Sequence, residues 1–305
     1  MSITSVALIG ATGSLGSVIL SALLSHPSQF KITILQRSSS PSPAPPGTTL
    51  ILIPDTFPLA ELTTALLPID AVITCFPLTS VTTHLRIASA AFAAGVQRFI
   101  PADFGSVDSR SAYARELVPL FGKKAQVREL LEELSTQRPD FGWTSLVVGH
   151  LYDWGLGNGF LHFWPGERRA EILGDGKAKS SLSTMGRVAE AVVGILGAEE
   201  GVYRDGMKGR VLMVQSFCVS QEEVLRVLER VVGGEWKVEY RETGEFIRGR
   251  KEAADAGSKE AIEDLVFALG VVDGNWEGKE DFAMGLLGLE DEDLEEETRK
   301  ALGVV

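Results

Sequence analysis

The chain has 305 residues, of which 45% are hydrophobic, and a formal net charge of −12. This length can bury a large core and indicates two domains or one elaborated α/β domain. The net acidity argues against nucleic acid or an anionic membrane as the partner. We find no apolar run near the ~18 residues that span a bilayer and no cleavable leader, so we expect a soluble cytoplasmic protein, monomeric or homodimeric.

The first element is an apolar run, residues 6–9, followed by a glycine-rich turn and a helical segment over residues 17–24. The turn carries Gly10, Gly13 and Gly16 at a spacing of three. Glycine adopts positive φ without steric cost, and a helix N-terminus offers free N–H groups and partial positive charge to a phosphate. The spacing is not G-x-G-x-x-G, but a strand before it and a helix after it indicate a dinucleotide-binding turn. The alternative is a turn that starts a helix and binds nothing.

Residues 31–36 are predicted to form the second strand, followed by Arg37 and a Pro- and Ser-rich loop over residues 38–47. Such a loop cannot hold regular structure. NAD-binding proteins usually place an acidic residue at the position of Arg37 to hold the ribose hydroxyls, whereas a basic residue suits a 2′-phosphate. We therefore predict NADPH as the cofactor. The alternative is an arginine that merely begins a solvated loop.

Strands and helices then alternate up to residue 148. Strands are expected over residues 49–53, 71–76, 98–101 and 143–148, and helices over residues 59–67, 83–94 and 122–136. This order predicts βαβ units and an α/β fold with a Rossmann-type, doubly wound parallel sheet. We assign residues 1–150 to an NADP-binding Rossmann domain and residues 151–305 to a smaller α+β substrate domain, with a return of the chain into the Rossmann sheet left open.

Two loops should line the cleft, because ligands bind at the carboxyl ends of parallel strands. The fourth strand runs into residues 75–77 and the fifth into residues 101–105. Cys75 is expected to be a buried apolar residue, since no basic residue lies near it in sequence. Neither it nor Cys218 has metal-ligand or disulfide spacing, and no metal site is predicted. Asp103 is either a substrate contact or the cap of the next helix.

Two lysines, Lys123 and Lys124, lie one turn before Val127, a residue of the inner stripe of the predicted helix over residues 122–136. Burial disfavours a charged lysine, but at a cleft a lowered pKa makes lysine a usable acid or base. Helical geometry does not choose between the two residues. A pair of surface lysines with buried stems fits the same pattern.

The segment after residue 148 is expected to be an irregular, aromatic-lined connection. His150 follows the sixth strand and should face the cleft, as a catalytic residue or as a satisfied structural histidine. The aromatic residues are expected to wall a pocket for a flat, apolar substrate, with plain core as the alternative. The predicted substrate-binding residues are His150, Tyr152, Trp154, Phe160, Phe163 and Trp164.

The remainder of the chain is predicted to hold short strands and helices. Strands are expected over residues 170–173, 180–183, 210–214 and 237–240, and helices over residues 186–197 and 221–232. Ser220 and Glu223 have the spacing of a capping box. The acidic run over residues 290–297 is expected to be the solvated face of a C-terminal helix.

Four blocks of the sequence resemble the isoflavone reductase-like branch of the NmrA-like, atypical short-chain dehydrogenase family. They are the turn Gly10–Gly16, the segment Gly95–Gly105, the K-x-x-V-R run Lys124–Arg128 and the hairpin Gly174–Lys179. The family includes phenylcoumaran benzylic ether reductase and pinoresinol–lariciresinol reductase. Residues 149–155 look like the fungal members, which often serve secondary metabolism.

The resemblance implies a Rossmann domain that binds NADP(H) and a lysine that acts as acid or base after the fifth strand. The K-x-x-V-R register assigns that role to Lys124. The Tyr-x-x-x-Lys pair of standard short-chain dehydrogenases is absent from the family and from this sequence. The predicted cofactor-binding residues are Gly10, Thr12, Gly13, Ser14, Leu15, Gly16, Arg37, Ser38, Phe76, Pro101, Lys124 and Gly149.

Three features depart from the family. Residues 38–48 contain no second basic residue to help Arg37, Phe76 replaces a small residue, and His84 stands where the family often has Gln.

The resulting prediction is an NADPH-dependent reductase that passes hydride to a conjugated, aromatic-type acceptor. The acceptor would be an activated C=C, a quinone methide or an iminium carbon of an aromatic or alkaloid-like substrate. Lys124 would move the proton, with His150 or Asp103 assisting, and a coupled cyclisation is left open. The alternative is a non-catalytic, NADP(H)-sensing regulator of the NmrA type.

Overall fold

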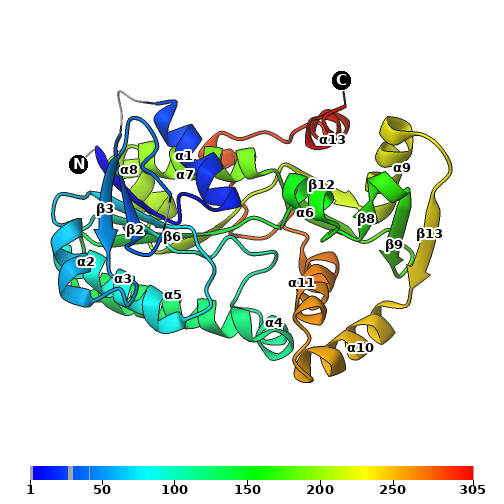
Figure 1. Cartoon of the computed structure of the whole chain (residues 1–305), viewed down its shortest axis with the longest axis horizontal. Helices are drawn as coiled ribbons and strands as arrows, with labels where there is room; N and C mark the ends of the chain where they lie inside the picture. Colours follow the sequence, from blue (N-terminus) through cyan, green and yellow to red (C-terminus); the bar gives the residue numbers. More distant parts are fainter. Residues whose placement is uncertain (1–2, 27–29, 41, 305) are drawn as a thin grey trace. The chain divides into compact units, whose positions relative to one another are not determined.

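The computed structural model describes residues 3–26, 30–40 and 42–304. The chain divides into two compact units whose elements are labelled in Figure 1. The first unit contains the chain up to Asp103 with residues 122–146 and 189–212, and the second contains the rest of the described chain. The predicted functional division after residue 150 stays a prediction.

The first unit is built on a seven-stranded sheet with the order β11-β6-β5-β4-β1-β2-β3. Its strands are β1 (Ser5–Ile9), β2 (Lys31–Arg37), β3 (Thr49–Ile53), β4 (Ala71–Thr74), β5 (Arg98–Ile100), β6 (Gly142–Val147) and β11 (Arg210–Met213). The pairs from β3 through β6 are parallel. The strand order reverses direction at β1, as in a dinucleotide-binding Rossmann sheet, so the predicted α/β class is confirmed.

Helices cover both faces of this sheet. They are α1 (Ser14–Leu24), α2 (Leu59–Leu66), α3 (Val81–Ala94), α5 (Pro119–Gln137), α7 (Met185–Gly197) and α8 (Glu200–Val202), which is followed by a π-helical turn, η2 (Tyr203–Met207). Figure 1 shows α1, α7 and α8 on one face and α2, α3 and α5 on the other. Because both faces are covered, β1 and β4 are buried over almost their whole length, and apart from Ser5 and Thr74 their sequences are apolar at every position rather than alternating.

The second unit contains two small sheets with the orders β12-β10-β7 and β13-β9-β8. The strands are β7 (His150–Leu151), β8 (Phe163–Trp164), β9 (Arg169–Leu173), β10 (Lys179–Ser183), β12 (Phe217–Ser220) and β13 (Lys237–Arg241). The helices are α4 (Ala112–Leu117), α6 (Tyr152–Asn158), α9 (Gln221–Val232), α10 (Thr243–Asp255), α11 (Lys259–Asp273), α12 (Met284–Leu287) and α13 (Leu294–Leu302), and a 3₁₀ turn, η1, spans Pro165–Glu167.

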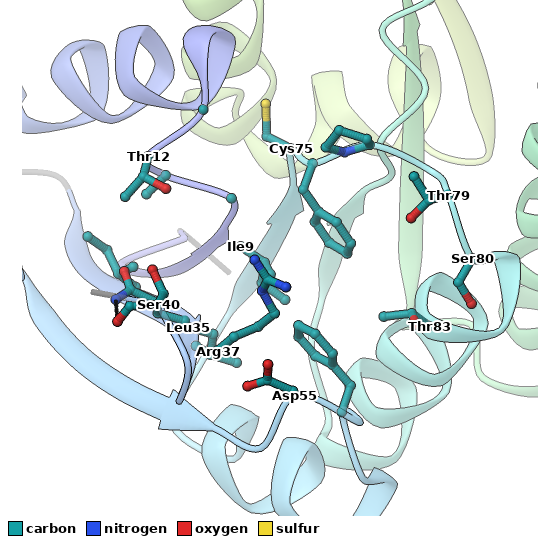
Figure 2. A pocket seen from close by; sticks show the side chains of 18 residues that line it. Ile9, Thr12, Leu35, Arg37, Ser40, Asp55, Cys75, Thr79, Ser80 and Thr83 are labelled. Atoms are coloured by element: carbon teal, nitrogen blue, oxygen red, sulfur yellow. Dashed lines mark hydrogen bonds between the residues drawn. The ribbon is translucent and has the colours of Figure 1, made fainter. Parts of the chain in front are cut away.

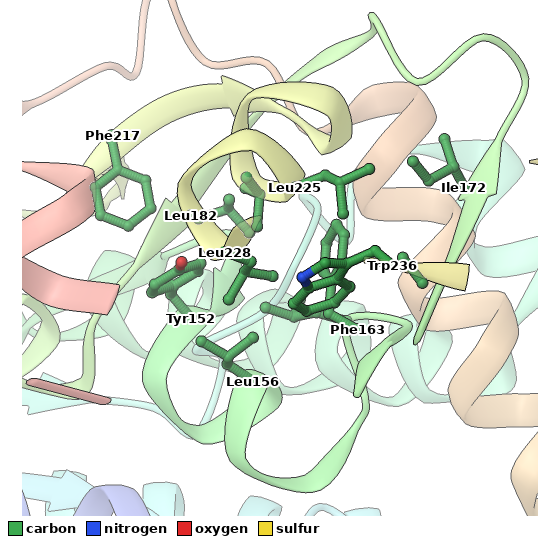
Figure 3. Close-up of a cluster of buried hydrophobic side chains, with 12 residues drawn as sticks. Tyr152, Leu156, Phe163, Ile172, Leu182, Phe217, Leu225, Leu228 and Trp236 are labelled. Atoms are coloured by element: carbon green, nitrogen blue, oxygen red, sulfur yellow. The ribbon is translucent and has the colours of Figure 1, made fainter. Parts of the chain in front are cut away.

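An apolar cluster fills the space around α6 and α9 in this unit (Figure 3). The Tyr152 ring packs edge-on against Phe217 with centroids 5.0 Å apart, and its hydroxyl lies 2.6 Å from the Thr298 hydroxyl. Phe163 and Trp236 belong to the same cluster. Tyr152 and Phe163 are therefore core residues of the second unit, which is the arrangement that the plain-core alternative predicts.

The expectation of an irregular connection after Gly149 is wrong, because residues 152–158 form helix α6. Tyr152 and Leu156 lie one helical turn apart and are 0% and 2% exposed. Burial of this face stabilises the helix in spite of its two glycines, whose propensity costs about 1 kcal/mol each. At Gly155 a side chain would meet Leu161 at 2.8 Å, so close packing requires the glycine.

The bounds of helix α13 and strand β12 are seen only in the structure. Helix α13 begins only at Leu294, within the acidic run, because the Asp293 side chain caps it by accepting a 2.8 Å hydrogen bond from the Glu296 N–H. Strand β12 contains Cys218, and its four residues are too short for a periodic signal that would set its bounds. The capping box of Ser220 and Glu223 on α9 is confirmed.

Candidate functional site

The glycine turn between β1 and α1 brings the backbone of two strands very close together. Gly10 has φ +98°, and a Cβ on it would lie 2.2 Å from the carbonyl oxygen of Cys75 at the end of β4. A Cβ on Gly16 would lie 2.1 Å from the Gly10 carbonyl oxygen. Gly13 is the N-cap of α1 and has no side chain to accept from the first-turn N–H groups, which leaves these donors available to an anion.

A cavity of about 440 Å³ lies beside this turn, at the carboxyl ends of β1, β2 and β4 (Figure 2). Its lining includes Thr12, Arg37, Ser40, Asp55 and Phe76. The volume falls within the range of small-molecule sites, and its place is the switch point of the sheet. A glycine-rich turn at one end and a guanidinium at the other are groups that could hold the phosphates of an adenine dinucleotide.

An aromatic wall closes one side of this cavity. The Phe76 ring stacks on His84 at 4.2 Å and lies parallel to Phe57 at 6.1 Å. Burial lowers the pKa of His84 to about 4, so its ring is neutral at physiological pH. The two residues that depart from the family, Phe76 and His84, thus form one stacked unit. Burial also raises the pKa of the Cys75 thiol to about 12, which agrees with an unreactive cysteine.

A buried charged cluster lies at the end of β5. The Lys124 ammonium donates a 2.6 Å hydrogen bond to the main-chain carbonyl of Asp103 and lies 3.6 Å from its carboxylate. The Arg128 guanidinium and the Ser145 hydroxyl both donate to that carboxylate. Lys124 is 8% exposed, Asp103 2% and Arg128 4%. Two cations thus share one buried carboxylate.

This cluster bears on the alternatives at both predicted positions, and the functional roles of Asp103 and Lys124 stay predictions. Asp103 does not cap the next helix, because Ser111 caps α4 and the Asp103 side chain points to Arg128. Burial lowers the pKa of Lys124, the Asp103 carboxylate partly offsets this, and Arg128 lowers it further. Lys123 is partly exposed and donates to the Thr79 carbonyl at 3.0 Å. Of the two lysines, Lys124 has the buried environment that lowers the pKa of an acid–base group.

Arg128 is a residue of this site that sequence reasoning did not single out as functional. Its signals were its place at the end of the K-x-x-V-R run and its spacing, four residues after Lys124, which places both side chains on the same face of α5. Ser145 on β6 carried no signal, because its contact with Asp103 spans 42 residues.

His150 lies in the second unit, on β7. It is 3% exposed, and its Nε2 lies 3.3 Å from the Val266 carbonyl. Its ring contacts Phe160 and Phe267, and Gly270 leaves the space that the ring occupies. Burial lowers the pKa of His150 to about 4. These contacts are typical of a satisfied structural histidine, and its catalytic role stays a prediction.

The second unit has its own cavity, of about 590 Å³. Three of the predicted substrate-binding residues, Trp154, Phe160 and Trp164, line it together with His162. Gly149 has φ +71°, and a Cβ on it would lie 2.0 Å from the Ser181 carbonyl, so this glycine permits close approach of β10. Pro101 is buried after β5. The roles of all these residues in ligand binding stay predictions.

His162, which was not predicted, joins two acidic side chains of the second unit. Its Nδ1 lies 3.0 Å from Glu171 and its Nε2 3.2 Å from Asp264, while its ring stacks on Phe267 at 4.1 Å. Arg241 also pairs with Glu171 at 2.8 Å. Burial by itself would lower the pKa of His162, but the two carboxylates outweigh it and raise that pKa above 6.5.

The stability of the protein should therefore depend on pH through His162. Because its folded pKa is raised, its contribution is complete below about pH 6.5 and is lost as the pH rises through the folded pKa. We expect the free energy of unfolding to fall as the pH is raised above about 6.5 and through the folded pKa of His162, and His162→Gln to flatten this slope. Urea unfolding at several pH values measures it, with the exposed His26→Gln as control. An equal slope in His162→Gln would contradict the assignment.

No helix in the described residues is both long and apolar enough to cross a membrane. Likewise, no group of three or more potential metal ligands occurs among residues 3–26, 30–40 and 42–304.

The fold and the cavity at the glycine turn define a Rossmann-type, dinucleotide-binding protein. The model of the NmrA-like family matches residues 3–152. The oxidoreductase aprR of Aspergillus flavus is 33% identical over 236 residues, which cover 77% of this chain and 76% of that protein. This chain therefore belongs to the NmrA-like family and is an oxidoreductase of that family. The predicted family is confirmed.

Other relatives extend the match to the whole chain. The oxidoreductase poxI of Penicillium oxalicum is 29% identical over 301 residues, covering 96% of this chain and 92% of that protein. A structure of isoflavone reductase superposes with a TM-score of 0.77 at 18% identity, covering 98% of this chain and 100% of that one.

Two further neighbours were solved with a nicotinamide cofactor. AtPrR2 with NADP+ and (+)pinoresinol has a TM-score of 0.77 at 18% identity, covering 97% of this chain and 98% of that one. Leucoanthocyanidin reductase with NADPH, from Vitis vinifera, has a TM-score of 0.75 at 18% identity, covering 98% and 99%. The predicted cofactor agrees with the cofactors of these structures.

Proposed function

We propose that this protein is an NADPH-dependent reductase in which Lys124 handles the proton that accompanies hydride transfer. The observation that carries the proposal is the buried ammonium of Lys124, held on the Asp103 carbonyl at the end of β5. Burial lowers the pKa of this lysine, which makes it a better proton donor near neutral pH than a solvated lysine.

Different residues around the first cavity would bind different parts of the cofactor. The turn Gly10–Gly16 and the N-terminus of α1 would hold the pyrophosphate, and Arg37 would pair with the 2′-phosphate. Phe76 offers an apolar face beside them. NADPH, when bound, supplies the hydride.

The acceptor is proposed to be a conjugated, aromatic-type molecule. Hydride would add to one carbon of an activated double bond, a quinone methide or an iminium, and for the neutral acceptors Lys124 would give a proton to the conjugated atom that gains the electron pair. The isoflavone reductase-like neighbours support this class, because one of them was solved with (+)pinoresinol. In the second cavity, Trp154, Phe160 and Trp164 offer aromatic faces, beside charged side chains that include Arg169, Glu171 and Arg250. A place in secondary metabolism and a coupled cyclisation stay predictions.

Isotope transfer tests the proposal. The protein would be incubated with NADPH carrying deuterium at one face of C4 of the nicotinamide, together with a panel of such acceptors. We expect one deuterium in the product from one stereoisomer of the cofactor and none from the other. NADPH that binds, followed by fluorescence, but is never oxidised with any acceptor would contradict the reductase and favour an NADP(H)-sensing regulator.

Removing the Arg37 guanidinium should change cofactor preference. A hydrogen-bonded ion pair with a phosphate contributes about 1.5–3 kcal/mol, so Arg37→Ala should weaken NADPH about 10- to 100-fold and NADH less than threefold. Fluorescence titration with both cofactors measures this. Arg204→Ala removes an exposed arginine of the same unit that pairs with Asp205 and does not line the cavity, and should change neither affinity. Equal losses for both cofactors in Arg37→Ala would refute the assignment.

A further inference from the structure

The serine loop after Arg37 has most of its hydrogen-bond donors already engaged. The backbone N–H and the hydroxyl of Ser38 both donate to the Ile53 carbonyl, at 2.8 and 3.0 Å. The N–H of Ser40 donates to the Arg37 carbonyl at 3.0 Å. Ser38 was predicted to bind the cofactor beside Arg37, but both of its donors bind an oxygen of the protein itself.

Ser39 donates two hydrogen bonds to the carboxylate of Asp55. Its N–H donates to one carboxylate oxygen of Asp55 at 3.1 Å, and its hydroxyl donates to the other. Asp55 follows β3 and takes from Ser39 the pair of donors that a bound phosphate would take. The bonds from Ser39 lower the pKa of Asp55, and the charge of Arg37 adds to this, so the carboxylate is ionised at neutral pH.

Asp55 also belongs to the cavity itself. It lines the same space as Arg37 and Ser40, and Figure 2 shows the three side chains around the end of β2. A 2′-phosphate paired with Arg37 would thus come close to a fixed negative charge. A 2′-hydroxyl in the same place is neutral and can donate a hydrogen bond to a carboxylate.

We propose that Asp55 sets how strongly this protein discriminates NADPH from NADH, by occupying Ser39 and placing a negative charge beside the 2′-phosphate position. The proposal rests on the cofactor site of the proposed function. Arg37 attracts the phosphate, Asp55 repels it, and the balance leaves the preference for NADPH weaker than Arg37 alone would give. Asp55 is a specificity-determining residue and takes no part in hydride transfer.

The test uses the adenosine halves of the two cofactors, 2′,5′-ADP for NADPH and 5′-AMP for NADH, which differ only in the 2′-phosphate. Isothermal calorimetry would measure 2′,5′-ADP and 5′-AMP binding to the wild-type protein and to Asp55→Asn. Asparagine keeps an oxygen that accepts from the Ser39 N–H but removes the charge. We expect Asp55→Asn to bind 2′,5′-ADP roughly five- to tenfold more tightly than wild type, because this is the size of one screened charge repulsion. Its affinity for 5′-AMP should stay within twofold of wild type or be weaker.

Matched variants separate this effect from a general change of charge. Glu61→Gln removes an exposed carboxylate of α2 that does not line the cavity, and should leave both affinities within twofold. Asp55→Ala should shift selectivity in the same direction as Asp55→Asn, which keeps the test valid if one variant folds poorly. Added salt should shrink the difference between Asp55→Asn and wild type.

The outcomes distinguish this proposal from the cofactor site on which it rests. If the wild type binds 2′,5′-ADP through Arg37 but Asp55→Asn leaves the ratio of the two affinities unchanged, or lowers it, Asp55 does not control selectivity. If the wild type binds neither nucleotide, or Arg37→Ala binds 2′,5′-ADP as tightly as wild type does, the proposed cofactor site fails and this inference fails with it.

Discussion

Replacing Lys124 with methionine is expected to lower kcat by about 10²- to 10⁴-fold while the protein still folds and binds NADPH. This is the usual contribution of a positioned acid–base group. Methionine keeps the apolar stem that packs in the interior and removes only the ammonium, which here lies 2.6 Å from the Asp103 carbonyl. Steady-state oxidation of NADPH with an accepted substrate measures kcat, and fluorescence titration measures cofactor affinity.

The pH profile gives this prediction a second readout. Lys124 acts as a proton donor only when protonated, so activity should fall as the pH rises through its pKa. Because burial lowers that pKa, the basic limb of kcat/KM should lie below the 10.5 of an ordinary lysine and should be absent from Lys124→Met.

Lys123→Met is the matched comparison, because Lys123 is adjacent but donates to Thr79 from a partly exposed position. We expect its kcat to change by less than about threefold. A large loss in Lys123→Met, with little change in Lys124→Met, would transfer the role to Lys123.

Replacing Asp103 with alanine is expected to cost about 3–5 kcal/mol of unfolding free energy, because it leaves buried charge without its partner. The Asp103 carboxylate accepts from Arg128 and Ser145 and lies 3.6 Å from the Lys124 ammonium. All three charged side chains of this cluster are less than 9% exposed, so water cannot replace the lost carboxylate. Urea unfolding at neutral pH, followed by tryptophan fluorescence, measures the change.

A carboxylate on the surface of the same unit provides the control for Asp103→Ala. Glu132 is exposed on α5, and Glu132→Gln should change the unfolding free energy by less than about 0.5 kcal/mol. A loss in Asp103→Ala as small as that in Glu132→Gln would show that the buried cluster contributes little to stability.

Much of the first unit follows from local sequence. The strand before Gly10, the turn and helix α1 are specified by residues within twenty positions of one another. Arg37 ends β2 as its position indicates, and Lys124 lies on the predicted helix. Periodicity and glycine placement act over short distances along the chain, so they can be recognised without the fold.

The glycines after Gly149 indicated an irregular connection for the aromatic segment, and this prediction is wrong. Tyr152 became part of a helix and of the core, because its partners Phe217 and Thr298 come from distant parts of the chain. Local propensity favoured a loop there, and burial against those partners outweighed it.

The sequence by itself determined a Rossmann-type oxidoreductase with a basic residue at the end of β2 and a lysine after the fifth strand. Only the tertiary structure decided which groups hold those residues. Asp103 meets Arg128 and Ser145 across 25 and 42 residues, and His162 meets Asp264 across 102. Asp55 meets Ser39 through the pairing of β2 and β3. Side-chain contacts of this kind depend on strand order and register, which no local pattern encodes.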